Sequence, residues 1–240
     1  MDSPFVYVDK ITLLQNSLPV FQDLSASFAA RQMTGLVAPN GAGKSTFFKI
    51  LSGLLAPNKG RVWLNGINVY QNPKQAKRAI GFCPHHPKLY AHLTLNENFG
   101  HLAKLHDLPK KEAWDAIDKI KEELNLTALG QCLFYQLSEG TQQRAGIAAS
   151  LIHQPLILIL DEPTSLCDPD NQEIIFQTLK AYQKLGNTII FSTQQLEEAH
   201  KYCDAIYTIK NLRLVPLILQ PQEPVPLQKP SVFSQETRAL

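Results

Sequence analysis

A glycine-rich loop between an apolar run and a helical pattern limits the possible folds of this chain more than any other feature. Residues 33–37 are apolar and predict a strand, and residues 45–55 carry apolar side chains at helical spacing. A strand, a Gly-Lys-Ser-Thr loop and a helix in this order predict a phosphate-binding loop within an α/β fold. The residues expected to surround the phosphates are Asn40, Gly41, Ala42, Gly43, Lys44, Ser45 and Thr46.

The chemistry of this loop follows from its residue types. Backbone N–H groups and the N-terminus of the following helix attract phosphate oxygens. Lys44 would reach the β- and γ-phosphates of a nucleotide, and the hydroxyl of Ser45 would bind Mg²⁺. The first glycine of the usual pattern is Ala38 here, and alanine resists a positive φ. We therefore expect backbone strain or reshaping at Ala38.

Two consecutive carboxylates follow a second apolar run. Residues 156–160 predict a buried strand, and Asp161 and Glu162 come directly after it, at the end where parallel sheets bind ligands. Asp161 would hold Mg²⁺ through a water molecule, and Glu162 would act as the general base that polarises an attacking water. Taken alone, two solvated carboxylates at the end of a strand are a competing interpretation.

The remaining patterns describe an α/β fold with an insertion. The apolar runs at 156–160 and 188–192 predict a parallel sheet covered on both faces. Residues 5–8 predict a short edge strand, and residues 61–64 predict a strand closed by an Asn-Gly turn. Residues 84–153 show helical spacing without strands. The predicted fold class is a P-loop NTPase-type α/β fold: a mostly parallel sheet with helices on both faces, a small antiparallel strand region and an inserted helical subdomain.

The chain divides into one domain and a tail. Residues 1–214 form the predicted domain, which includes the helical subdomain at about 84–153. Residues 215–240 contain five prolines in 26 positions, a composition that favours an extended or disordered segment.

The overall composition excludes several classes of protein. The net charge of +2 is too balanced for a nucleic-acid-binding surface, so no nucleic-acid partner is expected. No apolar run approaches the roughly 20 residues of a membrane-spanning helix, and the N-terminus lacks the pattern of a signal peptide. The four cysteines form no C-x-x-C pair, and a cytosolic protein is not expected to join them in disulfides. A role at a membrane would therefore require a partner that spans it.

A third motif points to a family. Residues 137–144 read Leu-Ser-Glu-Gly-Thr-Gln-Gln-Arg and precede an apolar helix. Together with the loop at 38–46 and the two carboxylates, this order resembles the ATP-binding cassette (ABC) ATPases, whose signature is usually L-S-G-G-Q. The resemblance covers residues 5–215 and implies that residues 1–214 are an ABC ATPase domain that binds ATP and Mg²⁺. It also implies a head-to-tail pair of cassettes, in which Ser138 and Gly140 of one contact the γ-phosphate held by the other.

Five positions depart from the pattern of this family: Ala38, His85, Glu139, Leu166 and Gln194. A histidine that senses the γ-phosphate usually stands where Gln194 is. Glutamine donates a hydrogen bond but carries no charge. Losing one charge-assisted hydrogen bond in the transition state costs about 2.7–4 kcal/mol, or about 10²–10³ in rate, by analogy with oxyanion-hole deletions. Since Glu162 is intact, we predict ATP binding with slow but non-zero hydrolysis.

His85 stands where the family usually has a glutamine that touches Mg²⁺ and the attacking water. Mg²⁺ prefers oxygen ligands, so we expect His85 to support other groups or to couple the site to the helical subdomain. A loop histidine with no ligand role is an equal alternative. Glu139 replaces a glycine and is unfavourable near phosphate unless it faces solvent or pairs with a basic group.

Two further regions of the site differ from the family. The loop before Asp168 normally crosses to the partner cassette, and Leu166 would stiffen or displace it. Leu14 and Gln15 occupy the positions where an aromatic side chain usually stacks on adenine, and we expect Phe21 to pack in the core. Adenine would then be held by apolar contacts alone.

The resemblance is to the export branch of the family. It implies an ATP-binding and ATP-hydrolysing subunit that drives export through a separate polytopic membrane permease. The subunit would work in the cytoplasm, at the membrane, with a second cassette that is either a copy or a relative. A non-hydrolysing regulatory cassette and a soluble ABC protein without a transport role are the alternatives.

Overall fold

The structure is a computed structural model that describes residues 5–217. Most of the predicted tail, residues 218–240, lies outside the described residues. Residues 215–217, which the sequence assigns to that tail, form the end of the last strand, β10. None of the helices within residues 5–217 has the length and apolar character needed to cross a bilayer.

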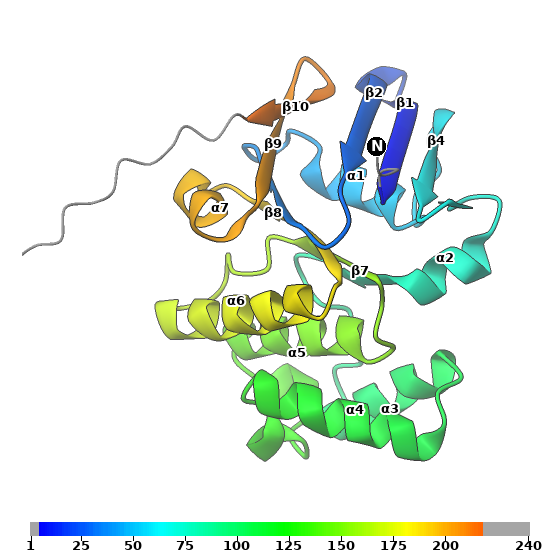
Figure 1. The fold of residues 1–240 in the computed structure, drawn as a ribbon. Helices are drawn as coiled ribbons and strands as arrows, with labels where there is room; N and C mark the ends of the chain where they lie inside the picture. The colour runs from blue at the N-terminus through cyan, green and yellow to red at the C-terminus, as the bar shows by residue number, and fades with distance from the viewer. Residues whose placement is uncertain (1–4, 218–240) are drawn as a thin grey trace, which may run out of the picture.

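A six-stranded sheet forms the centre of the molecule (Figure 1). Its strand order is β10-β9-β3-β8-β7-β6, and every pair except β10 with β9 is parallel. This confirms the mostly parallel sheet predicted from the apolar runs. The strands are β3 (Met33–Val37), β6 (Ile80–Cys83), β7 (Ile157–Asp161), β8 (Thr188–Thr193), β9 (Ala205–Lys210) and β10 (Arg213–Leu217).

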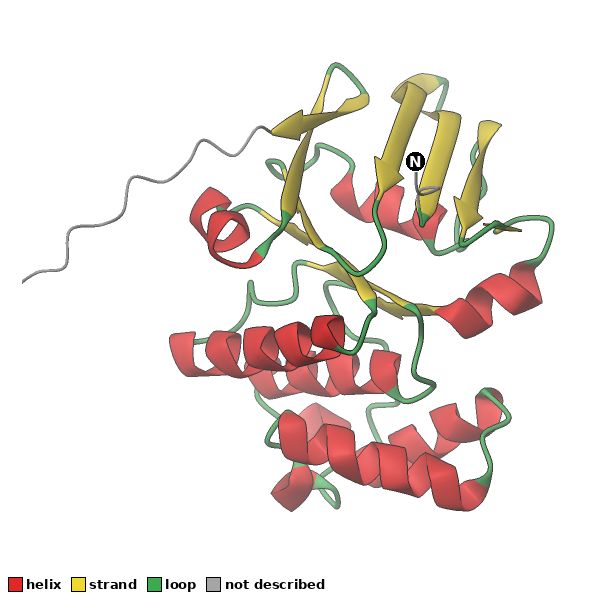
Figure 2. Cartoon of the chain, in the orientation of Figure 1, coloured by secondary structure: helices red, strands yellow, loops and turns green. Residues whose placement is uncertain are grey.

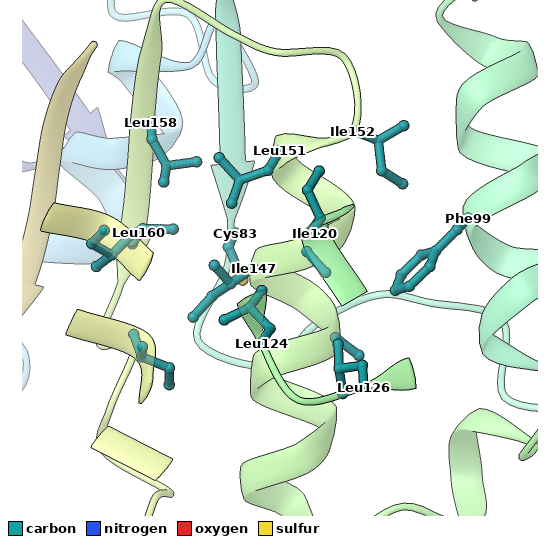
Figure 3. Close-up of a cluster of buried hydrophobic side chains, with 14 of the residues drawn as sticks. Cys83, Phe99, Ile120, Leu124, Leu126, Ile147, Leu151, Ile152, Leu158 and Leu160 are labelled. Carbon is teal, nitrogen blue, oxygen red and sulfur yellow. The ribbon is translucent and has the colours of Figure 1, made fainter. Parts of the chain in front are cut away.

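Alternate side chains of β7 supply two separate hydrophobic cores. Ile157 and Ile159 join the cluster that contains Phe47 of helix α1 (Lys44–Leu51), whereas Leu158 and Leu160 join the cluster that contains Phe99. This is the period-two alternation of a strand that is buried on both faces. Figure 3 shows Leu158 on the side of Leu151 and Leu160 on the side of Ile147, both of helix α5 (Glu139–Leu151), with Phe99 further from the strand.

A second, antiparallel sheet covers the other side of α1 (Lys44–Leu51), which packs between the two sheets through Phe47 and Phe48. Its strand order is β2-β1-β4-β5. The predicted short edge strand at residues 5–8 is therefore wrong: β1 has ten residues and lies between β2 and β4. The strands are β1 (Val6–Gln15), β2 (Leu18–Phe28), β4 (Lys59–Leu64) and β5 (Ile67–Asn68).

Helices occupy the chain between β6 and β7, where the insertion is predicted (Figure 2). Helix α3 begins at a capping box, in which Thr94 and Glu97 bond to each other's backbone N–H groups. The segment contains the helices α3 (Leu95–Leu105), α4 (Lys110–Glu123) and α5 (Glu139–Leu151). Two short 3₁₀ helices, η1 (Thr127–Leu129) and η2 (Phe134–Gln136), lie between α4 and α5. The other helices are α2 (Pro73–Ala79), α6 (Pro169–Lys184) and α7 (Leu196–Tyr202).

Candidate nucleotide-binding site

Two glycines in the loop between β3 and α1 adopt backbone conformations with positive φ. Gly41 and Gly43 have φ values of 77° and 98°, which only glycine adopts readily. Ala38 is not among the residues with positive φ, and its N–H donates to the carbonyl of Thr193 at 3.4 Å. The expected strain at Ala38 is therefore absent, because the left-handed positions fall later in the loop.

Gly43 also touches the antiparallel sheet. A Cβ atom at this position would lie 3.0 Å from the ring of Phe21 and 3.5 Å from Val20. Phe21 is fully buried, as the sequence predicts. Strand β2 therefore packs against the loop through Val20 and Phe21. A side chain at position 43 would clash with these residues and would strain the backbone.

Lys44, the first residue of α1, points its amine back into the loop. The side chain is 5% exposed, and Nζ donates to the carbonyl oxygens of Ala38 at 2.8 Å and Pro39 at 3.2 Å. Nζ also lies 3.0 Å from Oε1 of Glu162. The cationic head is thus held where the loop, the N-terminus of α1 and the end of β7 meet.

Glu162 follows β7 and is the centre of a cluster of donors. Its φ is 50°, and its side chain is 7% exposed. Nε2 of Gln194 donates to both carboxylate oxygens, at 3.2 and 3.1 Å, and Nδ1 of His85 lies 3.8 Å from Oε2. The sequence-predicted residues Lys44, Glu162, Gln194 and His85 are therefore brought together from four separate segments of the chain.

The donors around Glu162 keep its carboxylate charged. Burial alone would raise the pKa of Glu162, but hydrogen bonds from Lys44 and Gln194 and the charges of Lys44 and His85 hold it below the ordinary value for glutamate. A general base must be deprotonated to accept a proton. The environment of Glu162 therefore favours the form that this role needs at neutral pH.

Asp161 and Ser45 offer oxygen ligands at the same edge of the sheet. Asp161 is the last residue of β7 and accepts a hydrogen bond from the hydroxyl of Ser192 at 2.7 Å, and Ser45 follows Lys44 at the start of α1. A carboxylate and a hydroxyl are hard oxygen donors, the type that Mg²⁺ prefers. No group of three His, Cys, Asp or Glu residues suited to a metal occurs within residues 5–217.

The signature segment lies at the N-terminus of α5. Ser138 is the N-cap, and its hydroxyl accepts from the N–H of Thr141 at 3.3 Å. Among the described residues, no hydrogen bond or ion pair joins Ser138 or Gly140 to the cluster around Glu162. Glu139 is exposed in the first turn, where the helix dipole favours a carboxylate, so it faces solvent.

The loop after Glu162 is tied to helix α7 by a contact that sequence reasoning missed. The buried hydroxyl of Thr164 donates to Oε1 of Glu198, which is also buried, on α7. An acidic side chain on a short helix gives no sequence signal of burial. Further along this loop, Asp168 caps α6 by accepting from the N–H of Asn171 at 2.8 Å, and Leu166 is half-buried beside Gly140.

The two positions where the family usually has an aromatic side chain for adenine lie at the end of β1. Leu14 is exposed, and so is Gln15, at the end of that strand. The four cysteines are free thiols in the structure.

Comparison with known proteins gives one consistent result. The pattern of the ABC transporter family matches residues 21–165. The chain is 31% identical to the uncharacterized ABC transporter ATP-binding protein YdbJ of Bacillus subtilis, over 88% of this chain and 68% of that protein. It is 33% identical to the Nod factor export ATP-binding protein I of Sinorhizobium fredii, over 82% of this chain but only 57% of that protein.

Solved structures agree. One described as the ATP binding subunit of an ABC transporter superposes with a TM-score of 0.82 at 26% identity, covering 89% of this chain and 90% of the other. The family pattern spans more than half of this chain, and the loop, the two carboxylates and the signature stand in the order of that family. The chain therefore belongs to the ABC transporter family, as one of its ATP-binding cassettes.

Proposed function

We propose that this chain is the ATP-binding and ATP-hydrolysing subunit of an ABC exporter, working on the cytoplasmic face of a membrane. The observation that carries the proposal is the 3.0 Å contact between Lys44 and Glu162, which joins the phosphate-binding loop to the candidate base. The name of the Nod factor export relative supports the direction of transport. Measuring ATP turnover of the chain with its co-purified membrane subunit, in the presence and absence of Mg²⁺, tests it.

Hydrolysis would begin with an exchange of partners at Lys44. The phosphates of ATP, cradled by residues 40–46, compete with Glu162 for the amine, and Mg²⁺ bound by Ser45 and Asp161 would neutralise phosphate charge. Glu162 then accepts a proton from water as the water oxygen bonds to the γ-phosphorus and ADP leaves. Gln194 keeps Glu162 in place through two hydrogen bonds.

A second cassette would complete each site. Ser138 is exposed at the N-terminus of α5 and has no link to Lys44 or Glu162 within the described residues of its own chain. A helix N-terminus of this kind attracts phosphate. Ser138 and Gly140 of one cassette would therefore face ATP held by the other, in a homodimer or a heterodimer.

The membrane permease would dock in a groove of about 540 Å³ beside the site. The groove lies between the end of α1, helix α2, the loop after β6, and helices α3 and α5. Its lining combines apolar side chains such as Leu89 and Leu102 with Lys49, Lys77 and Lys88. The lining residues include no Asp or Glu within the described chain, so a short amphipathic segment with acidic residues fits this groove.

Reversing the charge of the groove is expected to weaken this association. The double substitution Lys77→Glu and Lys88→Glu should raise the Kd for the membrane subunit by about tenfold and leave ATP affinity unchanged, because both lysines line only the groove. Co-purification and surface plasmon resonance would measure the loss. Lys111→Glu with Lys184→Glu, two exposed lysines outside the groove, is the matched control. Equal binding by both double variants would exclude the groove as the docking site.

Hydrolysis is proposed to be slow because residue 194 is a glutamine. Substituting Gln194→His should raise kcat by about 10–100-fold, since a histidine adds a charge-assisted donor in the transition state. Steady-state ATPase assays on the intact complex measure the change, and Gln195→His on the neighbouring residue is the control. Ordinary transporter rates in the wild type, unchanged by Gln194→His, would contradict slow hydrolysis.

A non-hydrolysing regulatory cassette is the second candidate function. It is favoured by one observation: Gln194 occupies both oxygens of Glu162. If ATP binding alone suffices, Glu162→Gln should leave the biological activity of the complex intact.

A further inference from the structure

We propose that His85 and Gln194 act as one coupled pair on Glu162, with His85 supplying the imidazole that position 194 lacks. The inference rests on the proposed hydrolytic function and names the residue on which its residual rate depends. His85 would be a positioning residue, because it acts through the carboxylate of Glu162.

The order of the strands brings the two side chains to one carboxylate. Strand β7, which ends just before Glu162, lies between β6 and β8 in the sheet. His85 follows β6 by two residues, and Gln194 follows β8 directly. Parallel strands end at the same edge, so side chains from the two neighbouring loops approach Glu162 from opposite sides.

Each side chain contacts Glu162 in a different way. Gln194 spans the carboxylate, with Nε2 at 3.2 Å from Oε1 and 3.1 Å from Oε2. Nδ1 of His85 lies 3.8 Å from Oε2 alone. The other ring nitrogen, Nε2, lies 3.4 Å from the hydroxyl of Ser165, which itself donates to the carbonyl of Glu162 at 3.1 Å. His85 is therefore held against the same loop that carries Glu162.

The arrival of ATP makes these two contacts decisive. Lys44 is the third side-chain partner of Glu162, and phosphate would draw it away. Of the side chains in residues 5–217 that bond or pair with this carboxylate, His85 and Gln194 then remain. Besides Gln194, the imidazole of His85 is then the second side chain that keeps the carboxylate of Glu162 in place. The side chain of His85 is 35% exposed, so it contributes little to the core.

A histidine at position 194 could replace His85 as the imidazole that contacts Glu162. Both oxygens of Glu162 lie within 3.2 Å of the side-chain nitrogen at position 194, so an imidazole there would meet the same carboxylate. A histidine at 194 would then supply the imidazole to Glu162 without help from position 85. Loss of the imidazole at 85 should therefore matter only while position 194 is a glutamine.

A double-mutant cycle on the full chain with its membrane subunit tests this coupling. His85→Gln should lower kcat by at least about tenfold with KM for ATP changed by less than about twofold, because the imidazole holds the base and not the nucleotide. In the Gln194→His background, the same substitution should change kcat by less than about twofold. His86→Gln, on the exposed neighbour whose ring lies 4.4 Å from that of His85, is the control and should leave kcat unchanged.

The outcomes separate this inference from the proposed function. A wild-type turnover equal to that of Glu162→Gln would overturn both. A turnover that Glu162→Gln abolishes but His85→Gln leaves unchanged would overturn the coupling alone. An equal loss from His85→Gln in both backgrounds would also overturn it, since a merely structural role of His85 is not rescued by a histidine at 194.

Discussion

Replacing Glu162 with glutamine is expected to lower kcat for ATP hydrolysis by about 10²–10⁴-fold, the usual contribution of a general base. The amide keeps the size of the side chain but cannot accept a proton. The carboxylate is 7% exposed and is charged because Lys44, Gln194 and His85 surround it. The Glu162→Gln variant should still bind ATP. Its affinity for ATP should increase, because Lys44 no longer pairs with a carboxylate. Single-turnover assays and calorimetric titration with ATP measure the two effects separately.

The matched control is Glu197→Gln, on an exposed carboxylate at the start of α7. It should change neither kcat nor ATP affinity. Hydrolysis by Glu162→Gln at the wild-type rate would show that another group activates the water.

Replacing Lys44 with alanine is expected to weaken ATP binding by about 10–100-fold. A hydrogen bond to a charged group contributes about 1.5–3 kcal/mol, and every 1.4 kcal/mol is tenfold in Kd. Lys44 is the cation held closest to the loop, with its amine bonded to Ala38 and Pro39 and paired with Glu162. Equilibrium binding of a fluorescent ATP analogue measures the loss.

Removing Lys44 also deprives the buried Glu162 of its ion pair with that amine, which lowers the stability of the folded protein. Thermal unfolding of the nucleotide-free protein measures that loss of stability. Lys49→Ala, on an exposed lysine in the last turn of the same helix, should leave ATP affinity as it is. Undiminished ATP affinity in Lys44→Ala would exclude the loop as the phosphate site.

The central sheet was predictable because its strands are continuous apolar runs. Residues 156–160 and 188–192 are rich in Leu, Ile and Phe, the composition typical of a strand covered on both faces. The strand itself is Ile157–Asp161, and Leu156 just before it is exposed. Strands β1 and β2 were not predictable in this way. Their pairing contains several register shifts, so Phe21, Leu24 and Phe28 are buried at a spacing of three and four residues. Such bulges remove the period of two on which strand recognition depends.

Some residues of the candidate site were predictable from the sequence, whereas the contacts between them were not. Local motifs predict Lys44, Asp161 and Glu162 because strand, loop and helix stand in one short stretch of chain. The contacts of Glu162 with Gln194 and His85 depend on the order of strands in the sheet, which the sequence does not state. The bond between Thr164 and Glu198 depends on the placement of α7 and has no local pattern.

The contact between Phe21 and Gly43 has a consequence for how small a working fragment of this chain can be. The phosphate-binding loop is a contiguous stretch, but its glycine rests on a ring from a strand of the other sheet. A truncated chain that starts at β3 would keep every residue of the motif. It would lose Val20 and Phe21, against which the loop packs at Gly43. The smallest unit able to bind a nucleotide is therefore longer than the motif, and it includes β2.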